Sequence, residues 1–496
     1  IGVRLVGSEM CIRDRDFYPL KPKASIFNHL VFFYLKDPLL FIRVSSYELQ
    51  LLEPCLQFFT LTSPKKFKAF MFKNISLISI SAIFGAGFTF LANFIFITHL
   101  NLSDFGLLAS SLVTINLYVS FVGFGIGLFW LNIYGIEGFK AARWLLPTLR
   151  LVFLFACLAI TSIILLSVLE GSNINKFIFS LIPWLLALVL NDLAAAKLQL
   201  QNKFNLLSLW LLFPHLSRII VAIYIVCVGG GLIDIANGFF FMAAIIMSLA
   251  LFQINKLLKQ DRDITHEVVP IQVLSIIDVF KKSWPFAASG FVYYIFFQTN
   301  ILILYWMIGP DAAGIYYAAF MVSVAIYIIP SAIFTKYLLP LQHSWAQNNA
   351  SKLLAVFRFS CGTMLLSGLC IAATVMVAAQ MSIFSIFGDE YFKASQIILI
   401  LAIAIPFRFM SIGIGGLLSV KNLMTEKIKC MSVVAAVNLI LNFSLIPYFS
   451  YYGAAIATIC SEFVLLALYL TTIQKKLFGS STWAKWNISI KSLQDL

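Results

Sequence analysis

One apolar run, residues 145–168, reads LLPTLRLVFLFACLAITSIILLSV and contains a single charged residue, Arg150. As an α-helix this run would extend roughly 36 Å, enough to cross the hydrocarbon core of a bilayer, which is about 30 Å thick. Comparable runs recur along the chain, which is 61% hydrophobic and only 11% charged. An ordinary soluble domain is about 45–50% apolar and about 25% charged. The composition therefore excludes a soluble globular protein and predicts an integral membrane protein.

The hydropathy pattern from Met71 onward predicts an all-α protein with about twelve membrane-spanning helices. The predicted spans are 75–98, 105–133, 145–168, 176–196, 206–228, 233–255, 284–308, 313–337, 353–379, 394–418, 430–448 and 452–472. Sixteen Lys and Arg residues fall in alternate loops and the helix ends beside them, whereas the opposite side holds only Lys176 and Lys393. Because cytoplasmic loops of membrane proteins collect basic residues, both termini are expected to be cytoplasmic. These basic loops account for the net charge of +14, so no nucleic-acid partner is needed to explain it.

Two terminal features fall outside this pattern. Residues 1–15 look like the conceptual translation of a transposon-based sequencing adapter, a kind of segment that is excluded from fold reasoning. Residues 16–70 carry charges or prolines too frequently to span a membrane. We expect residues 16–70 to be a non-native upstream extension, with Met71 as the native start. The alternative is a genuine cytoplasmic extension.

The longest and most charged loop between spans, about 256–283, divides the helices into two sets of six. It predicts an N-terminal lobe over 71–264, a C-terminal lobe over 265–478 and a cytoplasmic tail over 479–496. Because each lobe would contain six spans, an even number, both lobes would begin on the same side of the membrane and have the same orientation. That arrangement predicts a parallel repeat about an axis along the membrane normal.

A trace of this repeat occurs where the second helix of each lobe begins. The first lobe reads Ser103-Asp104-Phe105-Gly106-Leu107-Leu108, and the second reads Asp311-Ala312-Ala313-Gly314-Ile315-Tyr316. Both stretches place a glycine at the helix entry, where a bulky Cβ would obstruct a tight turn. The pattern favours a repeated helix entry.

Four stretches spread over about 400 residues carry a family resemblance. They are Leu102-Ser103-Asp104-Phe105-Gly106; Gly309-Pro310-Asp311-Ala312-Ala313-Gly314-Ile315-Tyr316-Tyr317-Ala318-Ala319; Phe387-Gly388-Asp389-Glu390-Tyr391; and Asn438-Leu439-Ile440-Leu441-Asn442 with Ile446-Pro447 and Gly453-Ala454-Ala455-Ile456-Ala457-Thr458. With these the chain resembles the polysaccharide flippases of the multidrug, oligosaccharidyl-lipid and polysaccharide exporter superfamily, which includes the O-antigen flippases. One departure is Gln298-Thr299-Asn300, which stands where members often carry an acidic residue midway along the seventh helix. Ion coupling at that position is therefore in doubt.

The resemblance implies a two-lobed, V-shaped bundle, like that of the MATE transporters, which alternates between inward-open and outward-open states. It implies an undecaprenyl-pyrophosphate-linked oligosaccharide as substrate, carried from the cytoplasmic to the outer leaflet of a bacterial inner membrane. The product would enter surface polysaccharide synthesis, such as O-antigen or lipopolysaccharide assembly. Partners would be membrane lipid, the lipid-linked oligosaccharide, a polysaccharide polymerase and the chain-length machinery.

Two mid-membrane arginines are the first candidates for binding the pyrophosphate. Arg218 lies about twelve residues into the fifth span and Arg408 about fourteen into the tenth. The planar guanidinium binds phosphate oxygens in pairs, and intramembrane charges usually face a cavity or a partner. The alternative is a structural ion pair with Glu462, which lies halfway along the twelfth span. Both interpretations stay open.

Other polar residues inside the spans have two interpretations each. His215 shares a helix face with Arg218 and is either a protonation switch or a satisfied polar residue beside Pro214. Asn116, Gln298 and Asn300 would either line a sugar path or form hydrogen bonds between helices.

Two further function classes compete with a flippase. A membrane glycosyltransferase or polymerase would need a sizeable outer loop with carboxylates or His, and the predicted outer loops are short. We therefore expect no enzymatic activity, no cofactor and no metal; the chain also lacks a Walker motif, HExxH and a nucleotide-binding glycine loop. A MATE-type multidrug exporter or a lipid II flippase would share the fold, although two arginines disfavour a cationic cargo.

Overall fold

The computed structural model describes residues 64–479, except 170–171, 269–273, 332–333, 335–341, 343–349, 381–390 and 420–422. The expected adapter translation, nearly all of the expected upstream extension and the C-terminal tail lie outside the described residues. So does most of the Phe387–Tyr391 motif. The chain divides into two compact units, and the helices below belong to the unit that contains Leu77 and all later described residues, except for the part of the first helix before Leu77.

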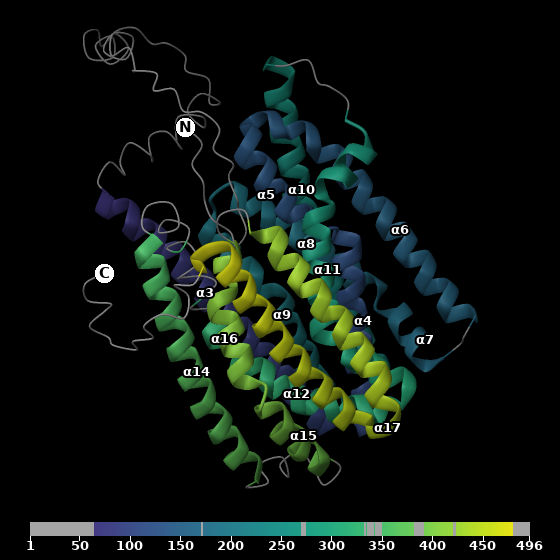
Figure 1. The fold of residues 1–496 in the computed structure, drawn as a ribbon. Helices are drawn as coiled ribbons and strands as arrows, with labels where there is room; N and C mark the ends of the chain where they lie inside the picture. The colour runs from purple at the N-terminus through teal and green to yellow at the C-terminus, as the bar shows by residue number, and fades with distance from the viewer. Residues whose placement is uncertain are drawn as a thin grey trace, which may run out of the picture. The chain divides into compact units, whose positions relative to one another are not determined.

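Every regular element in the described residues is helical (Figure 1). The elements are α3 (Pro64–His99), α4 (Leu102–Gly123), α5 (Ile126–Glu137), η1 (Gly138–Trp144), α6 (Leu145–Leu169), α7 (Asn173–Ser180), α8 (Ile182–Leu200), α9 (Phe204–Val228), α10 (Leu232–Val268), α11 (Ile276–Met307), α12 (Pro310–Ser331), α14 (Ala350–Gln380), α15 (Phe392–Ala402), α16 (Ile405–Gly415), η5 (Leu417–Ser419), α17 (Met424–Ile473) and η6 (Gln474–Phe478). Backbone groups in hydrocarbon must be satisfied within the protein, and helices do this within one segment. The predicted all-α class is confirmed.

Within the described residues, ten helices are long and apolar enough to cross a bilayer, and the bent pair α15 and α16 makes eleven. One of the ten, Met424–Phe478, has 55 residues and would be roughly 80 Å long if straight. It is broken at Ser450, whose φ of 50° and ψ of −132° are not helical. Asn438 and Ser461 are hydrogen-bonded across the two halves, which therefore lie side by side (Figure 1). With α17 as two passes, the described residues hold twelve candidate crossings, one for each predicted span, while residues 332–333 and 335–337 of the span 313–337 lie outside the described residues.

Three predicted spans are broken, and each break has a local cause. The span 105–133 is interrupted at Phe124 and Gly125, which have positive φ values of 44° and 62°. The span 394–418 bends by 51° between α15 and α16, where Pro406 begins a new helix because proline fits the first helical turn but not the interior. The span 176–196 divides into α7 and α8 at Leu181.

The stretch 256–283, predicted as the loop between two spans, is helical for most of its length. Helix α10 continues to Val268, and α11 already begins at Ile276. The Ser275 and Asp278 side chains form a reciprocal capping box at the start of α11, which satisfies two otherwise unpaired backbone donors. A helix that continues beyond the bilayer exposes its charged side chains to water. A run of charged residues therefore does not by itself end the helix.

Helix α4 contacts the second half of the chain at both of its ends. A Cβ on Gly106 would overlap the Pro310 carbonyl oxygen, and a Cβ on Gly314 would lie 2.9 Å from the Leu102 carbonyl oxygen. The two repeat-related glycines therefore allow α4 and α12 to meet backbone to backbone. At the other end of α4, a Cβ on Gly125 would lie 2.6 Å from the Phe286 carbonyl carbon of α11.

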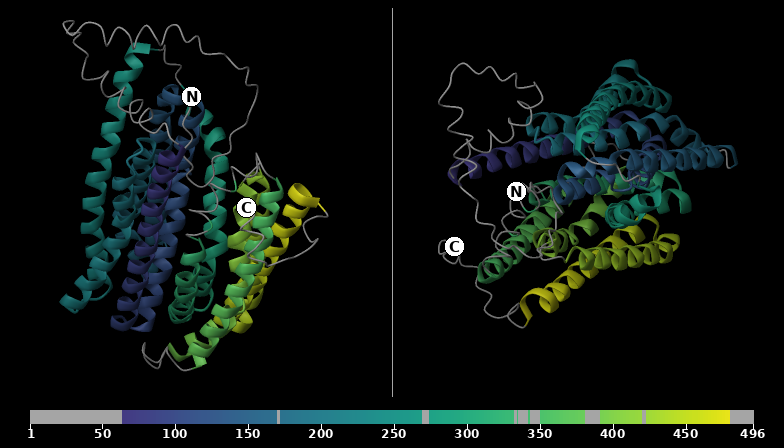
Figure 2. Two further views of the ribbon diagram at one scale, coloured as in Figure 1. Left: turned by 90° about the vertical axis from the view of Figure 1, so that its left-hand side faces the viewer. Right: turned by 90° about the horizontal axis from the view of Figure 1, so that it is seen from above.

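Helix α11 lies between the earlier and the later helices. It packs against α4 and against α17, and Figure 2 shows the green and yellow helices gathered on one side of it and the purple and blue helices on the other. The division into lobes at residues 264 and 265 stays a prediction. What the contacts establish is a junction in which one helix touches both groups.

Candidate functional site

A cavity of about 470 Å³ lies between α11, α16 and α17. This volume falls within the roughly 300–1,000 Å³ of ordinary ligand pockets. The lining residues are Leu128, Ser289, Gly290, Tyr293, Phe296, Ser331, Arg408, Ser411, Ile412, Gly415, Gly416, Ser419, Met424, Lys427, Met431, Leu465 and Tyr469. Leu128, on α5, is the contribution of the predicted N-terminal lobe. The cavity is thus formed mainly by the second half of the chain.

Arg408 lies on α16 with its side chain 12% exposed. Its Nη1 donates a hydrogen bond to Oε1 of Glu462 on α17, with 3.2 Å between the atoms. The guanidinium carbon lies 4.8 Å from the ring centroid of Phe297 and 5.9 Å from that of Phe296. The Nε atom of Arg408 is buried without a hydrogen-bond partner. Arg408 is therefore anchored on one side and retains unused donor capacity.

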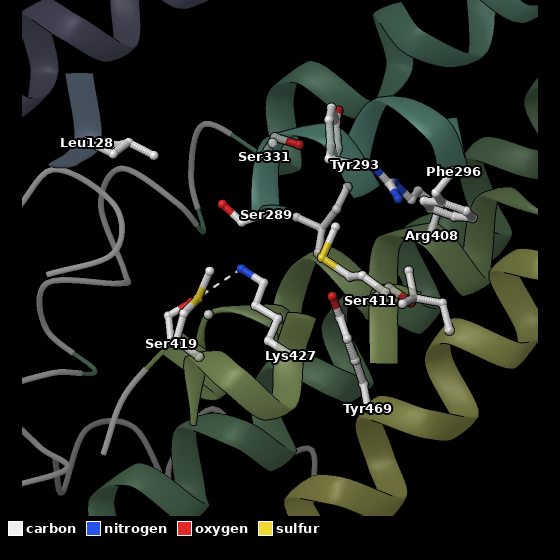
Figure 3. A pocket seen from close by; sticks show the side chains of 17 residues that line it. Leu128, Ser289, Tyr293, Phe296, Ser331, Arg408, Ser411, Ser419, Lys427 and Tyr469 are labelled. Carbon is white, nitrogen blue, oxygen red and sulfur yellow. Dashed lines mark hydrogen bonds between the residues drawn. The ribbon is translucent and has the colours of Figure 1, made fainter. Parts of the chain in front are cut away.

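Lys427 supplies the second positive charge of the cavity. It lies in the first turn of α17, and its Nζ donates a hydrogen bond to Ser419 Oγ over 3.2 Å. In Figure 3 its side chain extends between Ser289 and Ser419, while Arg408 lies farther along the cavity beside Phe296. The cavity therefore runs from the middle of the tenth span to the end that the charge pattern predicts to be cytoplasmic.

The lining residues include two cations and no carboxylate. Glu462 is 2% exposed and lies behind Arg408 rather than in the lining. The hydroxyl of Ser411, which does line the cavity, is buried without a hydrogen-bond partner. Two cations in a cleft attract an anion more strongly than they would in open water. The arrangement fits an anionic group such as a phosphate.

Asn300 is part of a closed hydrogen-bond network between helices. Its side-chain amide donates to Tyr316 Oη over 3.1 Å and to Thr458 Oγ1 over 2.8 Å. Its oxygen accepts from Asn442 Nδ2 over 2.8 Å. Asn300 itself is 3% exposed. The geometry matches the interpretation in which this residue joins helices rather than lines a sugar path.

The structure places Arg218 and His215 away from the cavity. His215 is half-buried on α9, and its Nδ1 lies 2.7 Å from Thr89 Oγ1 of α3. A Cβ on Gly85 would lie 2.5 Å from the same imidazole ring. Arg218 is half-buried one turn further along α9. The two predicted arginines are therefore not brought together, and Arg408 alone meets Glu462.

Gln298 and Asn116 lie outside the lining of the cavity. Gln298 is half-buried on α11, and its Oε1 is buried without a hydrogen-bond partner. Asn116 is half-buried on α4. A sugar path past these two residues stays a prediction.

Sequence reasoning did not single out two charged residues, one in the lining of the cavity and one in α8. Lys427 was assigned to a cytoplasmic loop, because nothing in the sequence shows that α16 and α17 enclose it. Asp192 lies in the middle of α8 with its side chain exposed. The polar pair Asn191-Asp192 inside an apolar run was a signal that could have identified it.

Within the described residues, no group of three His, Cys, Asp or Glu side chains is placed to hold a metal ion.

A family profile described as "Polysaccharide biosynthesis protein" matches residues 99–396, more than half of the chain. A comparison with curated protein sequences gave no match.

Several solved structures share this fold. "Lipid II flippase MurJ, inward closed conformation" is 15% identical with a TM-score of 0.60, covering 80% of this chain and 87% of that chain. An inward-facing multidrug resistance MATE family transporter of the MOP superfamily is 14% identical with a TM-score of 0.59, covering 82% and 99%. A MOP superfamily transporter from Pyrococcus furiosus is 13% identical with a TM-score of 0.53, covering 83% and 97%. At these identities the likeness establishes the fold and no substrate.

Proposed function

Because this chain belongs to the polysaccharide biosynthesis protein family, we propose that it is a flippase for lipid-linked oligosaccharides. It carries an undecaprenyl-pyrophosphate-linked unit from the cytoplasmic to the outer leaflet of a bacterial cytoplasmic membrane, and both of its termini are cytoplasmic. It makes and breaks no covalent bond. The translocated unit then passes to a polysaccharide polymerase and the chain-length machinery.

The cavity with Arg408 and Lys427 is the observation that supports this function. A pyrophosphate carries negative charge and several acceptor oxygens, which match the two cations of the lining. Guanidinium groups bind phosphate oxygens through short, charge-assisted hydrogen bonds. The cavity therefore replaces the water that the head group loses when it enters the membrane.

The membrane potential adds a driving force in the direction of export. Moving one charge across 100 mV is worth about 2.3 kcal/mol, so two negative charges that leave a cell with a negative interior gain about 4–5 kcal/mol. The polyprenyl tail needs no such help, because it stays in hydrocarbon throughout. A potential-driven flippase therefore requires cations at the head group rather than a nucleotide site.

Complementation tests this proposal. The chain is expressed in a bacterium that lacks its O-antigen flippase but still synthesises the lipid-linked glycan, and surface glycan is measured. We expect display to be restored, and to be lost again with Arg408→Gln together with Lys427→Gln at normal protein levels. Well-inserted protein that restores no display in several glycan backgrounds would count against oligosaccharide transport.

A multidrug exporter is the second candidate, and the shared fold with a MATE family transporter favours it. The positive lining of the cavity disfavours it, because cationic drugs would be repelled by Arg408 and Lys427. Drug susceptibility of the complemented strain separates the two functions. A lipid II flippase would handle the same pyrophosphate chemistry, and rescue of a strain depleted of its lipid II flippase identifies that case.

A further inference from the structure

Asp192 is a carboxylate in the middle of the membrane region. It is the eleventh residue of the 19-residue helix α8, so it lies roughly 15 Å from the start of the helix and roughly 12 Å from its end. Asp192 is exposed, whereas its neighbours Asn191 and Leu193 are buried. Among the described residues no cation forms an ion pair with it. A charge at this depth is costly in lipid, so we expect Asp192 to face a polar space between helices.

The surroundings of Asp192 lead toward the cationic cavity. Helix α5 packs on this face of α8, since a Cβ on Gly127 would lie 3.6 Å from the Asp192 carbonyl oxygen. The next residue, Leu128, lines the cavity that contains Arg408. Across from α8, Tyr294 on α11 lies within electrostatic range of the Asp192 carboxylate. Adjacent residues of α5 thus contact α8 at Asp192 and line the cavity.

The partner helices place further polar groups at the same level. A Cβ on Gly290 of α11 would lie 3.3 Å from Ser120 Oγ of α4. The two helices are antiparallel, so one turn further on Asn116 of α4 and Tyr294 of α11 lie at a common height. A carboxylate, an amide and a phenol are acceptors and donors suited to sugar hydroxyls, and the face of a tyrosine ring is apolar like the face of a pyranose.

We propose that Asp192, with Tyr294 and Asn116, binds the glycan part of the substrate while Arg408 and Lys427 hold its pyrophosphate. The assignment rests on the proposed function. The substrate has two chemically different parts that match these two groups of residues, since its phosphates are anionic and its sugars are rich in neutral hydroxyls. A carboxylate repels the pyrophosphate and accepts hydrogen bonds from hydroxyls, so the head group is held in one orientation. Asp192 thereby selects lipids that carry a sugar over the bare lipid pyrophosphate.

Two probes separate the two parts of the site. The full chain in lipid nanodiscs is titrated with undecaprenyl pyrophosphate and with the undecaprenyl-pyrophosphate-linked glycan extracted from the complemented strain. Asp192→Ala should weaken binding of the glycan lipid about tenfold or more, as expected for lost hydrogen bonds to a charged acceptor, and leave binding of the bare lipid within about twofold. Asp192→Asn, which keeps one carbonyl acceptor, should lie between Ala and wild type.

Matched variants make the outcomes distinguishable. Arg408→Gln should weaken binding of both lipids, whereas Asp234→Ala, which removes a half-buried carboxylate at the start of α10, should change neither. Equal losses for both lipids in Asp192→Ala, or no loss for either, would overturn the glycan assignment. A wild-type chain that binds neither lipid would instead overturn the proposed function. Loss of drug export in Asp192→Ala with glycan-lipid binding intact would assign the carboxylate to a cationic cargo.

Discussion

Arg408 and Glu462 form an ion pair between α16 and α17, with 3.2 Å between Nη1 and Oε1. Only the arginine lines the cavity, and the carboxylate behind it is 2% exposed. Glu462 therefore holds the guanidinium in place without meeting an incoming anion. The ion-pair interpretation and the binding interpretation of Arg408 are compatible, because the pairing uses one edge of the guanidinium and leaves Nε unpartnered.

Removal of one partner of this pair should be more harmful than removal of both. Glu462→Gln leaves a buried, uncompensated guanidinium, and breaking such pairs typically costs about 3–5 kcal/mol. We expect Arg408→Gln combined with Glu462→Gln to recover part of that loss, which thermal unfolding in detergent measures. The control is Lys429→Gln combined with Glu426→Gln, which removes an exposed pair and should leave stability unchanged. Additive losses at residues 408 and 462 would contradict the coupling.

Export should depend on both cations of the cavity. Arg408→Gln and Lys427→Gln each remove charge-assisted hydrogen bonds, worth about 1.5–3 kcal/mol apiece, and should each reduce glycan export by about tenfold or more. Lys429→Gln is the matched control, because Lys429 lies two residues from Lys427 but outside the lining. Surface glycan is quantified at equal protein levels. A control variant that reduces export as strongly would show that general charge, rather than the cavity, matters.

The contact between α4 and α12 should tolerate no side chain at Gly106. Gly106→Ala forces a Cβ into the Pro310 carbonyl, and overpacking of this kind costs typically 1–3 kcal/mol. Gly123→Ala, on the same helix with nothing within 4 Å of the added Cβ, should be neutral or stabilising by up to about 1 kcal/mol. Thermal midpoints of the purified proteins measure both effects. Equal midpoints for the two variants would contradict the close contact.

Asn300 should behave as a structural residue. Asn300→Ala removes three hydrogen bonds and leaves buried partners such as Asn442 unsatisfied, at about 1–3 kcal/mol for each orphaned group. A lower unfolding temperature with a proportionate loss of protein in the membrane is therefore expected. Asn116→Ala, on a half-buried side chain, should keep its stability. Normal stability of Asn300→Ala with loss of export would favour the sugar path instead.

The membrane architecture could be predicted from sequence because lipid imposes one simple rule, an apolar run of about twenty residues for each pass. The breaks within spans could not be predicted as easily. Phe124 is an apolar residue with nothing in its local sequence that marks a break, yet it has a positive φ at the point where α4 ends and α5 begins. The sequence pattern also did not predict that α10 continues to Val268. Charged residues there suggested a loop, whereas a helix outside the bilayer needs no apolar face.

The lining of the candidate cavity could be predicted in part, and the residues show why. Arg408 was identified because a charge in mid-membrane is costly and conspicuous. Lys427 was not, since lysines in loops are ordinary and only tertiary packing brings this one into the cavity. Asn300 had two plausible uses in sequence, and only the positions of Tyr316, Thr458 and Asn442 distinguish them.

The single-residue break at Ser450 bears on how the protein is made. The two halves of α17 have no hydrophilic loop between them, and exposed aromatic side chains such as Tyr448 and Phe449 flank the turn, as is usual at a membrane interface. The translocation machinery therefore has nothing polar to pull through between these passes. We therefore expect the two halves to enter the bilayer together, as one helical hairpin.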